Sequence, residues 1–459
     1  MEKLKLFGTS GIRGKAKIDM TTRLALKLGN TFASFLGNEG TVIVGRDVRL
    51  FANDLSKALI SGLLSGGLNV EDCGIAPTPA VLWALKKREL NGAVVITGSH
   101  TPKNMIGFLF FLKDTSELSY EESIQFENLY NAETKIPSHK YRGRRFEIDI
   151  SKIYLESVFN QVNIKKISSL NYKVILDPGN GASALFCSDI FKKAEIKTVI
   201  INNEPNGLFP NRDPYPRPEV LNDLSSKVKE VNADLGSASD GDGDRAIFVD
   251  DQGKVLWGDL SGAIFAKNAL INNGGGNIVT PINSSQLIAW VCKNYGGNLF
   301  FTKIGPPSIV KTMKEKGAIM GLEETGKNIW PNGIFYGDWV LATLKMLEIM
   351  AREGKSLSDI VKTFPNFYMK KETFYCHTNM KTQVLNQVLE EWKKRNENAQ
   401  LISIDGIRIN YEDNSWILFK PSGTEPVFRV YSESISLDRV EELANMGSKI
   451  VKKVLRACQ

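Results

Sequence analysis

The chain has 459 residues, of which 42% are hydrophobic and 24% are charged, an ordinary balance for a soluble globular protein. It is too long for one hydrophobic core, so about three or four domains are expected. No apolar run approaches the roughly 18 residues of a membrane span, and the first residues lack the apolar segment of a signal peptide. We therefore predict a cytoplasmic protein with no membrane partner.

Charge and cysteine content narrow the partners further. The formal net charge of +7 is compatible with nucleic-acid binding, but the basic residues are spread along the chain and form no clustered stripe. A small anionic molecule is therefore the expected partner, and nucleic acid is not. The five cysteines form no CxxC pair, which argues against a zinc site or a disulfide framework and fits a reducing compartment.

The first hundred residues predict alternating strands and helices. Residues 6–14 read Leu-Phe-Gly-Thr-Ser-Gly-Ile-Arg-Gly; the glycines and Arg13 suit the close approach of a phosphate, although the sequence is also typical of a tight turn. An α/β sheet is expected from this order of elements. Apolar spacing and β-branched runs predict a helix at 21–36, a strand at 41–47, a helix at 53–65, a strand at 69–73, a helix closing at 83–87 and a strand at 94–96.

Residues 93–102, Ala-Val-Val-Ile-Thr-Gly-Ser-His-Thr-Pro, bring a hydroxyl to the end of a strand. Ligands of open α/β sheets bind outside the carboxyl ends of the strands, so Ser99 lies where chemistry is expected. Pro102 is expected to fix the turn that holds this hydroxyl outward. Taken alone, the stretch is also compatible with an ordinary turn in which Ser99 and His100 only satisfy backbone groups.

The same plan recurs twice along the chain. Strands are predicted to begin at Lys173 and Asn277, as one begins at Thr41. A helix, a second strand, a second helix and a short third strand follow each of them, and the third strand ends in a polar loop. A repeat of about a hundred residues predicts three similar domains that face one cleft. The three polar loops are residues 97–102, 239–245 and 321–327.

The second of these loops reads Ser-Asp-Gly-Asp-Gly-Asp-Arg. Asp240, Asp242 and Asp244 would repel one another strongly without a cation, and the glycines between them let a tight loop turn all three inward. Because only hard oxygen ligands are present, Mg²⁺ is favoured over transition metals. An EF-hand also begins with alternating aspartates, but the glycine that it needs at the sixth place is Arg245 here.

The last part of the chain differs from the rest in its predicted helices and strands. Helices are predicted at 383–394 and 436–455 and strands at 416–420 and 428–431, which is typical of a small α+β domain. Residues 420–429 read Lys-Pro-Ser-Gly-Thr-Glu-Pro-Val-Phe-Arg. Hydroxyls and backbone N–H groups in this turn, with a cation on each side, could form a phosphate nest. The sequence is also typical of a surface turn.

Together, the glycine-rich opening, the hydroxyl loop, the three-aspartate loop, the carboxylate loop and the Ser-Gly-Thr-Glu-Pro turn resemble the α-D-phosphohexomutase family. This family comprises phosphoglucomutases, phosphomannomutases and phosphoglucosamine mutases, and the resemblance covers essentially the whole chain. It implies an α/β fold class with three similar mixed α/β domains and a C-terminal α+β domain of the TATA-binding-protein-like type around a central cleft. The expected domains are 1–148 with the serine loop, 149–252 with the metal loop, 253–366 with the sugar loop and 367–459 with the phosphate loop.

The resemblance also implies an activity. It is the Mg²⁺-dependent interconversion of hexose 1-phosphate and 6-phosphate by an intramolecular phosphotransferase, with glucose and mannose phosphates as substrates and glucosamine phosphate as a further candidate. The reaction would pass through a phosphoserine and a sugar bisphosphate in a monomer or homodimer. The implied catalytic residues are Ser99, Arg13, His100 and Arg245; the implied metal ligands are Ser99, Asp240, Asp242 and Asp244; and the implied contacts to the sugar-phosphate substrate are Glu323, Thr325, Lys327, Lys420, Ser422, Gly423, Thr424 and Arg429.

Several positions depart from the family pattern. Relatives commonly read Ser-His-Asn-Pro and then Asn-Gly-x-Lys, and here Thr101, Ile106 and Leu109 replace the two asparagines and the lysine. Residues 337–339 read Gly-Asp-Trp in place of Arg-Asp-Gly, which removes a cation and adds bulk, and Lys420 replaces an arginine. Two alternatives therefore stay open: a catalytically impaired sugar-phosphate-binding paralogue, and a mutase for another sugar such as a pentose phosphate.

Overall fold

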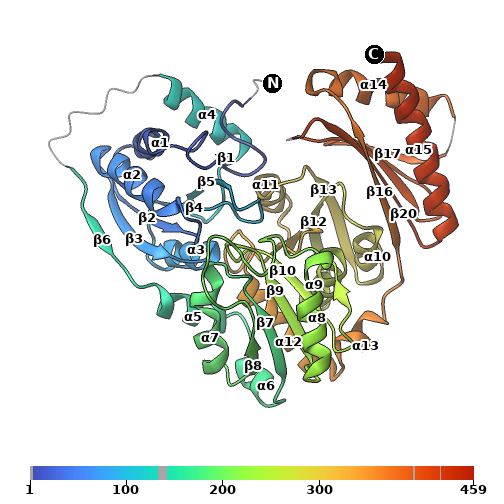
Figure 1. Cartoon of the computed structure of the whole chain (residues 1–459). Helices are drawn as coiled ribbons and strands as arrows, with labels where there is room; N and C mark the ends of the chain where they lie inside the picture. Colours follow the sequence, from blue (N-terminus) through green and yellow to red (C-terminus); the bar gives the residue numbers. More distant parts are fainter. Residues whose placement is uncertain (1–3, 133–141, 396–397, 424, 459) are drawn as a thin grey trace. The chain divides into compact units, whose positions relative to one another are not determined.

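The computed structural model describes residues 4–132, 142–395, 398–423 and 425–458 (Figure 1). The chain forms two compact units. Unit 1 comprises Met1–Ser261 and Thr325–Val361, and unit 2 comprises Gly262–Glu324 and Lys362–Gln459.

Unit 1 contains a six-stranded sheet in the order β1-β5-β4-β2-β3-β6. β2, β3, β4 and β6 run parallel, whereas β5 is antiparallel to both β4 and β1. Sequence patterning predicted the central parallel strands but not β5. The strands are β1 (Ile12–Lys15), β2 (Thr41–Arg46), β3 (Asn69–Ile75), β4 (Gly92–Ile96), β5 (Met105–Leu112) and β6 (Arg145–Glu147).

Two of the helices around this sheet, α1 and α4, begin at side-chain caps, and an aromatic cluster is buried beside them. Thr21 caps the first helix by accepting from the Leu24 backbone N–H, a role for which threonine is well suited. Phe32, Phe110 and Phe126 pack together with no exposed surface. These helices are α1 (Thr22–Phe35), α2 (Ala52–Ser65), α3 (Thr78–Lys87) and α4 (Tyr120–Asn131).

A second sheet in unit 1 has the order β11-β10-β9-β7-β8. Helix α12 packs against this sheet, and the indole of its first residue, Trp339, donates to the Ser237 hydroxyl on β9 at 2.8 Å. The strands are β7 (Lys173–Asp177), β8 (Lys197–Ile200), β9 (Leu235–Ser239), β10 (Ala246–Val249) and β11 (Val255–Leu256), and residues 328–329 form β15 (Asn328–Ile329). The helices are α5 (Ser151–Phe159), α6 (Ile164–Ser168), α7 (Cys187–Lys193), α8 (Asn222–Glu230), α12 (Trp339–Glu353) and α13 (Leu357–Val361).

Unit 2 contains two sheets of different kinds. Three parallel strands lie in the order β13-β12-β14, and a five-stranded antiparallel sheet has the order β16-β20-β19-β18-β17. The parallel strands are β12 (Gly276–Pro281), β13 (Gly297–Thr302) and β14 (Met320–Leu322), and the antiparallel ones are β16 (Tyr368–Tyr375), β17 (Gln400–Ser403), β18 (Ile407–Asn410), β19 (Trp416–Pro421) and β20 (Val427–Ser434). The helices are α10 (Gln286–Asn294), α11 (Pro306–Lys316), α14 (Lys381–Lys393) and α15 (Leu437–Cys458), while α9 (Gly258–Asn273) leads from unit 1 into unit 2.

A buried arginine joins the two sheets of unit 2. The Arg408 guanidinium is fully buried, donates to the carbonyls of Ile282 and Ser284 at 2.7 Å each, and stacks 3.9 Å from the Trp416 ring centre. Charge-assisted bonds of this kind are among the stronger polar contacts in proteins. Arg408 therefore fastens the antiparallel sheet to the loop after β12.

The predicted threefold repeat is confirmed. In each α/β sheet the first strand of the repeat is central, with the second strand on one side and the third on the other: β3-β2-β4, β8-β7-β9 and β13-β12-β14. The third strands, β4, β9 and β14, end at the three polar loops that the sequence singled out. The fold class, mixed α/β domains followed by a C-terminal α+β domain, is confirmed as well.

Within the part of the chain that the structure describes, none of the helices combines the length and the apolar character that a membrane crossing requires.

Candidate active site

The hydroxyl of Ser99 lies at the carboxyl end of β4 and meets the three-aspartate loop. It donates to Asp240 Oδ2 at 2.9 Å and lies 3.3 Å from His100 Nδ1. Ser99 has a φ of 48°, in the left-handed region that non-glycine residues seldom adopt and that is frequent at functional sites. The hydroxyl was expected to point outward, but Ser99 is only 2% exposed and its hydroxyl is bonded to Asp240.

Two residues that the sequence did not single out hold the serine loop. Arg49 donates to the carbonyls of Ser99, Thr101, Pro102 and Met105 at 2.6–2.9 Å. Asp47 in turn pairs with Arg49 at 3.1 Å. The loop is therefore fixed by a buried ion pair contributed by the segment after β2, and not by Pro102 alone as predicted.

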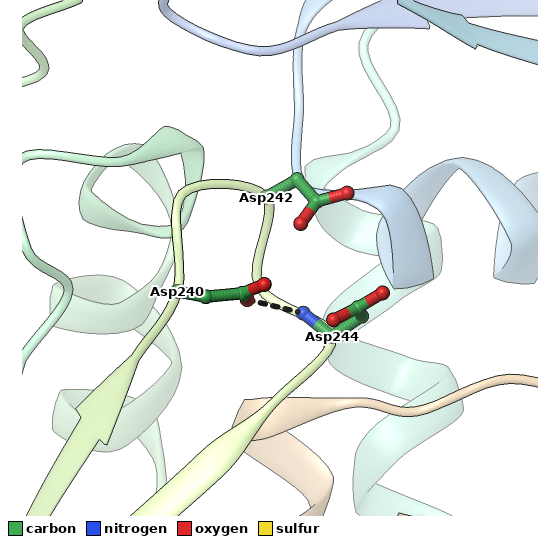
Figure 2. A group of neighbouring side chains, drawn as sticks. All are labelled: Asp240, Asp242 and Asp244. Carbon is green, nitrogen blue, oxygen red and sulfur yellow. Dashed lines mark hydrogen bonds between the residues drawn. The ribbon is translucent and has the colours of Figure 1, made fainter. Parts of the chain in front are cut away.

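The three aspartates converge in the loop between β9 and β10 (Figure 2). Asp240, Asp242 and Asp244 are at most 2% exposed, and each offers an oxygen within 4.8 Å of the others. The Asp244 backbone N–H donates to Asp240 Oδ1 at 3.1 Å, and the Thr78 hydroxyl donates to Asp242 Oδ2 at 2.8 Å. Gly243 has a φ of 81°, a conformation open to glycine that turns the loop back on itself.

This group of side chains fits a hard divalent cation. Asp242 Oδ1 and Asp244 Oδ1 are buried and accept no hydrogen bond, and an orphaned buried carboxylate oxygen is costly unless a cation satisfies it. Burial, together with the neighbouring Asp244 carboxylate, raises the pKa of both Asp240 and Asp242. An acidic cluster with only oxygen donors can bind a metal ion of the Mg²⁺ or Ca²⁺ type.

Cationic side chains surround the aspartates. Arg245 Nε lies 3.7 Å from Asp240 Oδ2 and 3.8 Å from Asp244 Oδ1, and the Arg245 guanidinium lies over the ring of Tyr215. Burial lowers the pKa of His100 well below its ordinary value, and the Arg245 and Arg13 charges lower it further. Both effects favour the neutral form of the His100 imidazole.

Arg13 and Glu117 form a further charged group near the site. Arg13 lies on β1, and its Nε is buried without a hydrogen-bond partner. Glu117, which the sequence analysis missed, is 4% exposed and accepts from the Ser10 hydroxyl at 3.0 Å. Burial raises the pKa of Glu117 to about 7, although the Lys327 and Arg13 charges oppose this shift. No local motif marks Glu117, because it follows an unpredicted strand.

The sugar loop is divided between the two units. Lys327, in unit 1, lies with its Nζ 2.8 Å from Asp244 Oδ2, so the structure pairs it with a proposed metal ligand. Thr325, also in unit 1, is half-buried. Glu323 belongs to unit 2 and is buried, and its neighbour Glu324 accepts from Asn283 and pairs with Lys371.

The Gly-Asp-Trp departure at 337–339 has a structural reason. A Cβ at Gly337 would overlap the carbonyl oxygen of Asp244, so an arginine does not fit here. Asp338 caps α12 and accepts from the Trp83 indole at 3.0 Å and from the Tyr154 hydroxyl at 2.8 Å. Trp339 is fully buried against β9, so its bulk packs into the core.

The predicted phosphate turn of unit 2 is held by internal partners. Lys420 Nζ pairs with Asp405 at 2.7 Å, and Arg429 pairs with Glu425. Lys381, which the sequence did not single out, donates to the carbonyls of Ser422 and Glu425. Gly423 is exposed, and Thr424 lies outside the described residues. The two cations that flank the predicted phosphate turn thus already have carboxylate partners.

Four family models match the chain in order. They describe domains I, II and III and the C-terminal domain of phosphoglucomutase/phosphomannomutase, and they cover residues 4–137, 152–253, 257–368 and 377–449. The chain belongs to the phosphoglucomutase/phosphomannomutase family. The family that the sequence resembles and the predicted enzyme class, that of phosphohexomutases, are thereby confirmed.

Individual members of the family are similar over the whole chain. A phosphoglucomutase/phosphomannomutase of Thermococcus kodakarensis is 35% identical over 98% of this chain and 99% of its own length. A phosphoglucosamine/phosphogalactosamine mutase of Sulfurisphaera tokodaii is 34% identical over the same shares. A solved structure of a family member from Burkholderia thailandensis has a TM-score of 0.85 and 25% identity, with 98% of each chain covered. Relatives of nearly equal similarity thus carry names for different sugars.

Proposed function

We propose that the protein is a Mg²⁺-dependent mutase that interconverts hexose 1-phosphate and hexose 6-phosphate through a phosphoserine at Ser99. The observation that carries the proposal is the 2.9 Å contact between the Ser99 hydroxyl and Asp240, in a loop with two orphaned carboxylate oxygens. A phosphoryl donor and a cation site in direct contact are what phosphoryl transfer requires.

In the proposed reaction, a sugar hydroxyl attacks the phosphorus atom of phosphorylated Ser99. The bond between phosphorus and Ser99 Oγ breaks as the new bond to the sugar oxygen forms, and the hydroxyl proton passes to a nearby base. The sugar bisphosphate then presents its other phosphoryl group, and Ser99 Oγ attacks that phosphorus, which restores the phosphoserine and releases the isomeric monophosphate. Atoms and charges balance over the cycle, and no oxidant or further substrate is needed.

The surrounding residues would divide the work. Asp240, Asp242 and Asp244 would hold Mg²⁺, which supplies positive charge where negative charge develops during the transfer. Arg49 keeps the serine loop in place through four carbonyl contacts, so Ser99 needs little reorganisation. Arg13 and Arg245 would orient phosphate oxygens, and His100 would exchange the proton.

In unit 2, Glu323 would recognise sugar hydroxyls, and the turn from Lys420 to Arg429 would hold the phosphate that is not being transferred. Glucose and mannose phosphates are the proposed substrates, with glucosamine phosphate as a further candidate. The 35% identical relative named for the first two sugars and the 34% identical relative named for hexosamines support this range.

The test follows conversion directly. The purified protein is incubated with Mg²⁺, a trace of the matching bisphosphate, and glucose 1-phosphate, mannose 1-phosphate, glucosamine 6-phosphate or ribose 1-phosphate, and ³¹P NMR records the products. Turnover of a hexose phosphate is expected for the wild type and for Ser61→Ala, whose exposed serine lies on α2, but not for Ser99→Ala. Preference for ribose 1-phosphate would replace the hexose assignment. Absence of turnover on all four would overturn the proposal, and calorimetric binding without turnover would favour the impaired paralogue.

A further inference from the structure

Lys327 was expected to contact the substrate, but its side chain is buried and is paired with a carboxylate of the aspartate loop. Its side chain is 3% exposed, its Nζ lies 2.8 Å from Asp244 Oδ2, and the ammonium lies 4.0 Å from the ring centre of Tyr336. A buried ammonium is costly unless it is paired. Here its partner is one of three clustered carboxylates.

Backbone hydrogen bonds hold the segment that carries Lys327 next to the aspartate loop. The Ala246 N–H, at the start of β10, donates to the carbonyl of Gly326 at 3.0 Å, and the Trp339 N–H donates to the carbonyl of Gly243 at 3.0 Å. The segment that carries Lys327 is thus bonded to the aspartate loop through the residue before Lys327 and again at the start of α12. The fold therefore places the backbone of Lys327 beside the aspartate loop, where its buried side chain reaches Asp244.

The carboxylate oxygens are shared out in a particular way. Lys327 pairs with Asp244 Oδ2, and Asp244 Oδ1 is buried without a hydrogen bond. In the same way, the Thr78 hydroxyl donates to Asp242 Oδ2, and Asp242 Oδ1 is buried without a hydrogen bond. The ammonium therefore does not use the oxygens that remain for a cation. A metal ion and Lys327 can share Asp244, at the cost of repulsion between two positive charges at short range.

We propose that Lys327 is a built-in counter-cation of the aspartate loop, which holds the loop in its metal-binding shape before the metal arrives and lowers the affinity for that metal. The inference rests on the proposed metal site and deepens it. It makes Lys327 a positioning residue that acts through Asp244, in place of the substrate contact that the resemblance implied.

The test compares Lys327→Met with Lys345→Met. Lys345 is a half-buried lysine of α12 that donates to the Gln161 carbonyl at 3.2 Å and lies over Trp330; it therefore controls for the loss of a lysine in the same unit. Thermal unfolding is recorded in EDTA and in Mg²⁺, and the dissociation constant for Mg²⁺ alone is measured by calorimetry at about pH 8, where free carboxylates are ionised. Lys327→Arg, which keeps the charge, is the rescue variant.

For Lys327→Met we expect a melting temperature several degrees below that of the wild type in EDTA, restored by Mg²⁺, and Mg²⁺ binding that is about tenfold tighter. Lys345→Met should lose stability equally in EDTA and in Mg²⁺, with the wild-type Mg²⁺ affinity, and Lys327→Arg should resemble the wild type in EDTA. Unchanged stability of Lys327→Met in EDTA, or unchanged or weaker Mg²⁺ binding, would overturn the inference. Absence of Mg²⁺ binding in the wild type would instead overturn the proposed metal site.

Discussion

The aspartate loop of unit 1 and the predicted phosphate turn of unit 2 differ in how their charged side chains are paired. In the aspartate loop, Asp242 and Asp244 keep one buried oxygen each without a hydrogen bond. In the phosphate turn, Lys420 and Arg429 are already paired with Asp405 and Glu425. The first region thus has buried carboxylate oxygens that a cation could satisfy, whereas the cations of the second region are already neutralised by carboxylates of the same unit.

This difference predicts different energetics for the two regions. A cation that binds a buried loop with unsatisfied carboxylate oxygens stabilises that loop strongly. Removal of the cation should therefore lower both turnover and the free energy of unfolding. In the phosphate turn, each cation would exchange a carboxylate partner for a phosphate. The free energy gained on phosphate binding is then only the difference between the two ion pairs. We therefore expect large effects from changes in the aspartate loop and modest effects from changes in the turn.

The largest effect should come from Asp242→Asn. The amide oxygen can still accept from Thr78, but the charge at the cation site is lost, and we expect turnover to fall about a thousandfold. Calorimetry should show loss of Mg²⁺ binding. Asp250→Asn is the matched control, since Asp250 is also buried, follows β10, and accepts with its side chain from the Gln252 and Lys254 backbones. Equal losses in the two variants would mean that the aspartate loop has no special demand for charge.

Arg408→Met should destabilise unit 2 while leaving the serine loop intact. Removal of this guanidinium leaves the buried carbonyls of Ile282 and Ser284 without a donor, which we expect to cost about 4 kcal/mol. Hydrogen exchange should show faster opening of β18 and β19 and unchanged protection of β4. Arg439→Met, which breaks half-exposed ion pairs with Asp413 and Glu442, should cost less than about 1 kcal/mol. Faster exchange at β4 in Arg408→Met would contradict the expectation that the effect of Arg408 is confined to unit 2.

Glu117→Gln should change how stability depends on pH. Burial raises the pKa of Glu117 from 4.5 to about 7 in the folded protein. The folded state thus binds the proton more tightly than the unfolded state, so this group favours folding below about pH 4.5 and loses that contribution as the pH rises through about 7. Glutamine loses nothing over this window. The stability of Glu117→Gln relative to the wild type should therefore increase by roughly 3 kcal/mol between these two pH values. Denaturant unfolding that gives a constant difference across the window would show that Glu117 has an ordinary pKa.

Much of the site could be predicted because its central residues lie in short local motifs. Ser99 and the three aspartates each follow a recognisable strand, and the structure brings them into contact. Arg49 and Lys381 act through carbonyl groups 41–56 residues away, and no sequence spacing reports such contacts. Glu117 was missed because β5, with its unbroken apolar run, was not recognised as a strand. The pairing of Lys420 with Asp405 was missed for the same reason as Arg49, since it depends on how β18 and β19 pair.

The smallest effect should come from the phosphate turn. Arg429→Ala removes a cation that must first leave Glu425, so we expect the KM for the hexose phosphate to rise only about tenfold with kcat nearly unchanged. Glu425→Gln frees Arg429 from its partner and should lower KM by a few-fold. Steady-state kinetics separate the two parameters. A thousandfold loss of kcat in Arg429→Ala would show that the turn, like the aspartate loop, acts in the transition state.

The central claim is that Ser99 and the aspartate loop together hold a transferable phosphoryl group. The most direct test is peptide mass mapping of the full-length protein after incubation with Mg²⁺ and glucose 1,6-bisphosphate, before and after an excess of glucose 1-phosphate is added. We predict one phosphoryl group on the Ser99 peptide, discharged by the monophosphate and absent from Asp242→Asn. A Ser99 that is never phosphorylated, or a phosphoryl group that the sugar cannot remove, would contradict the account.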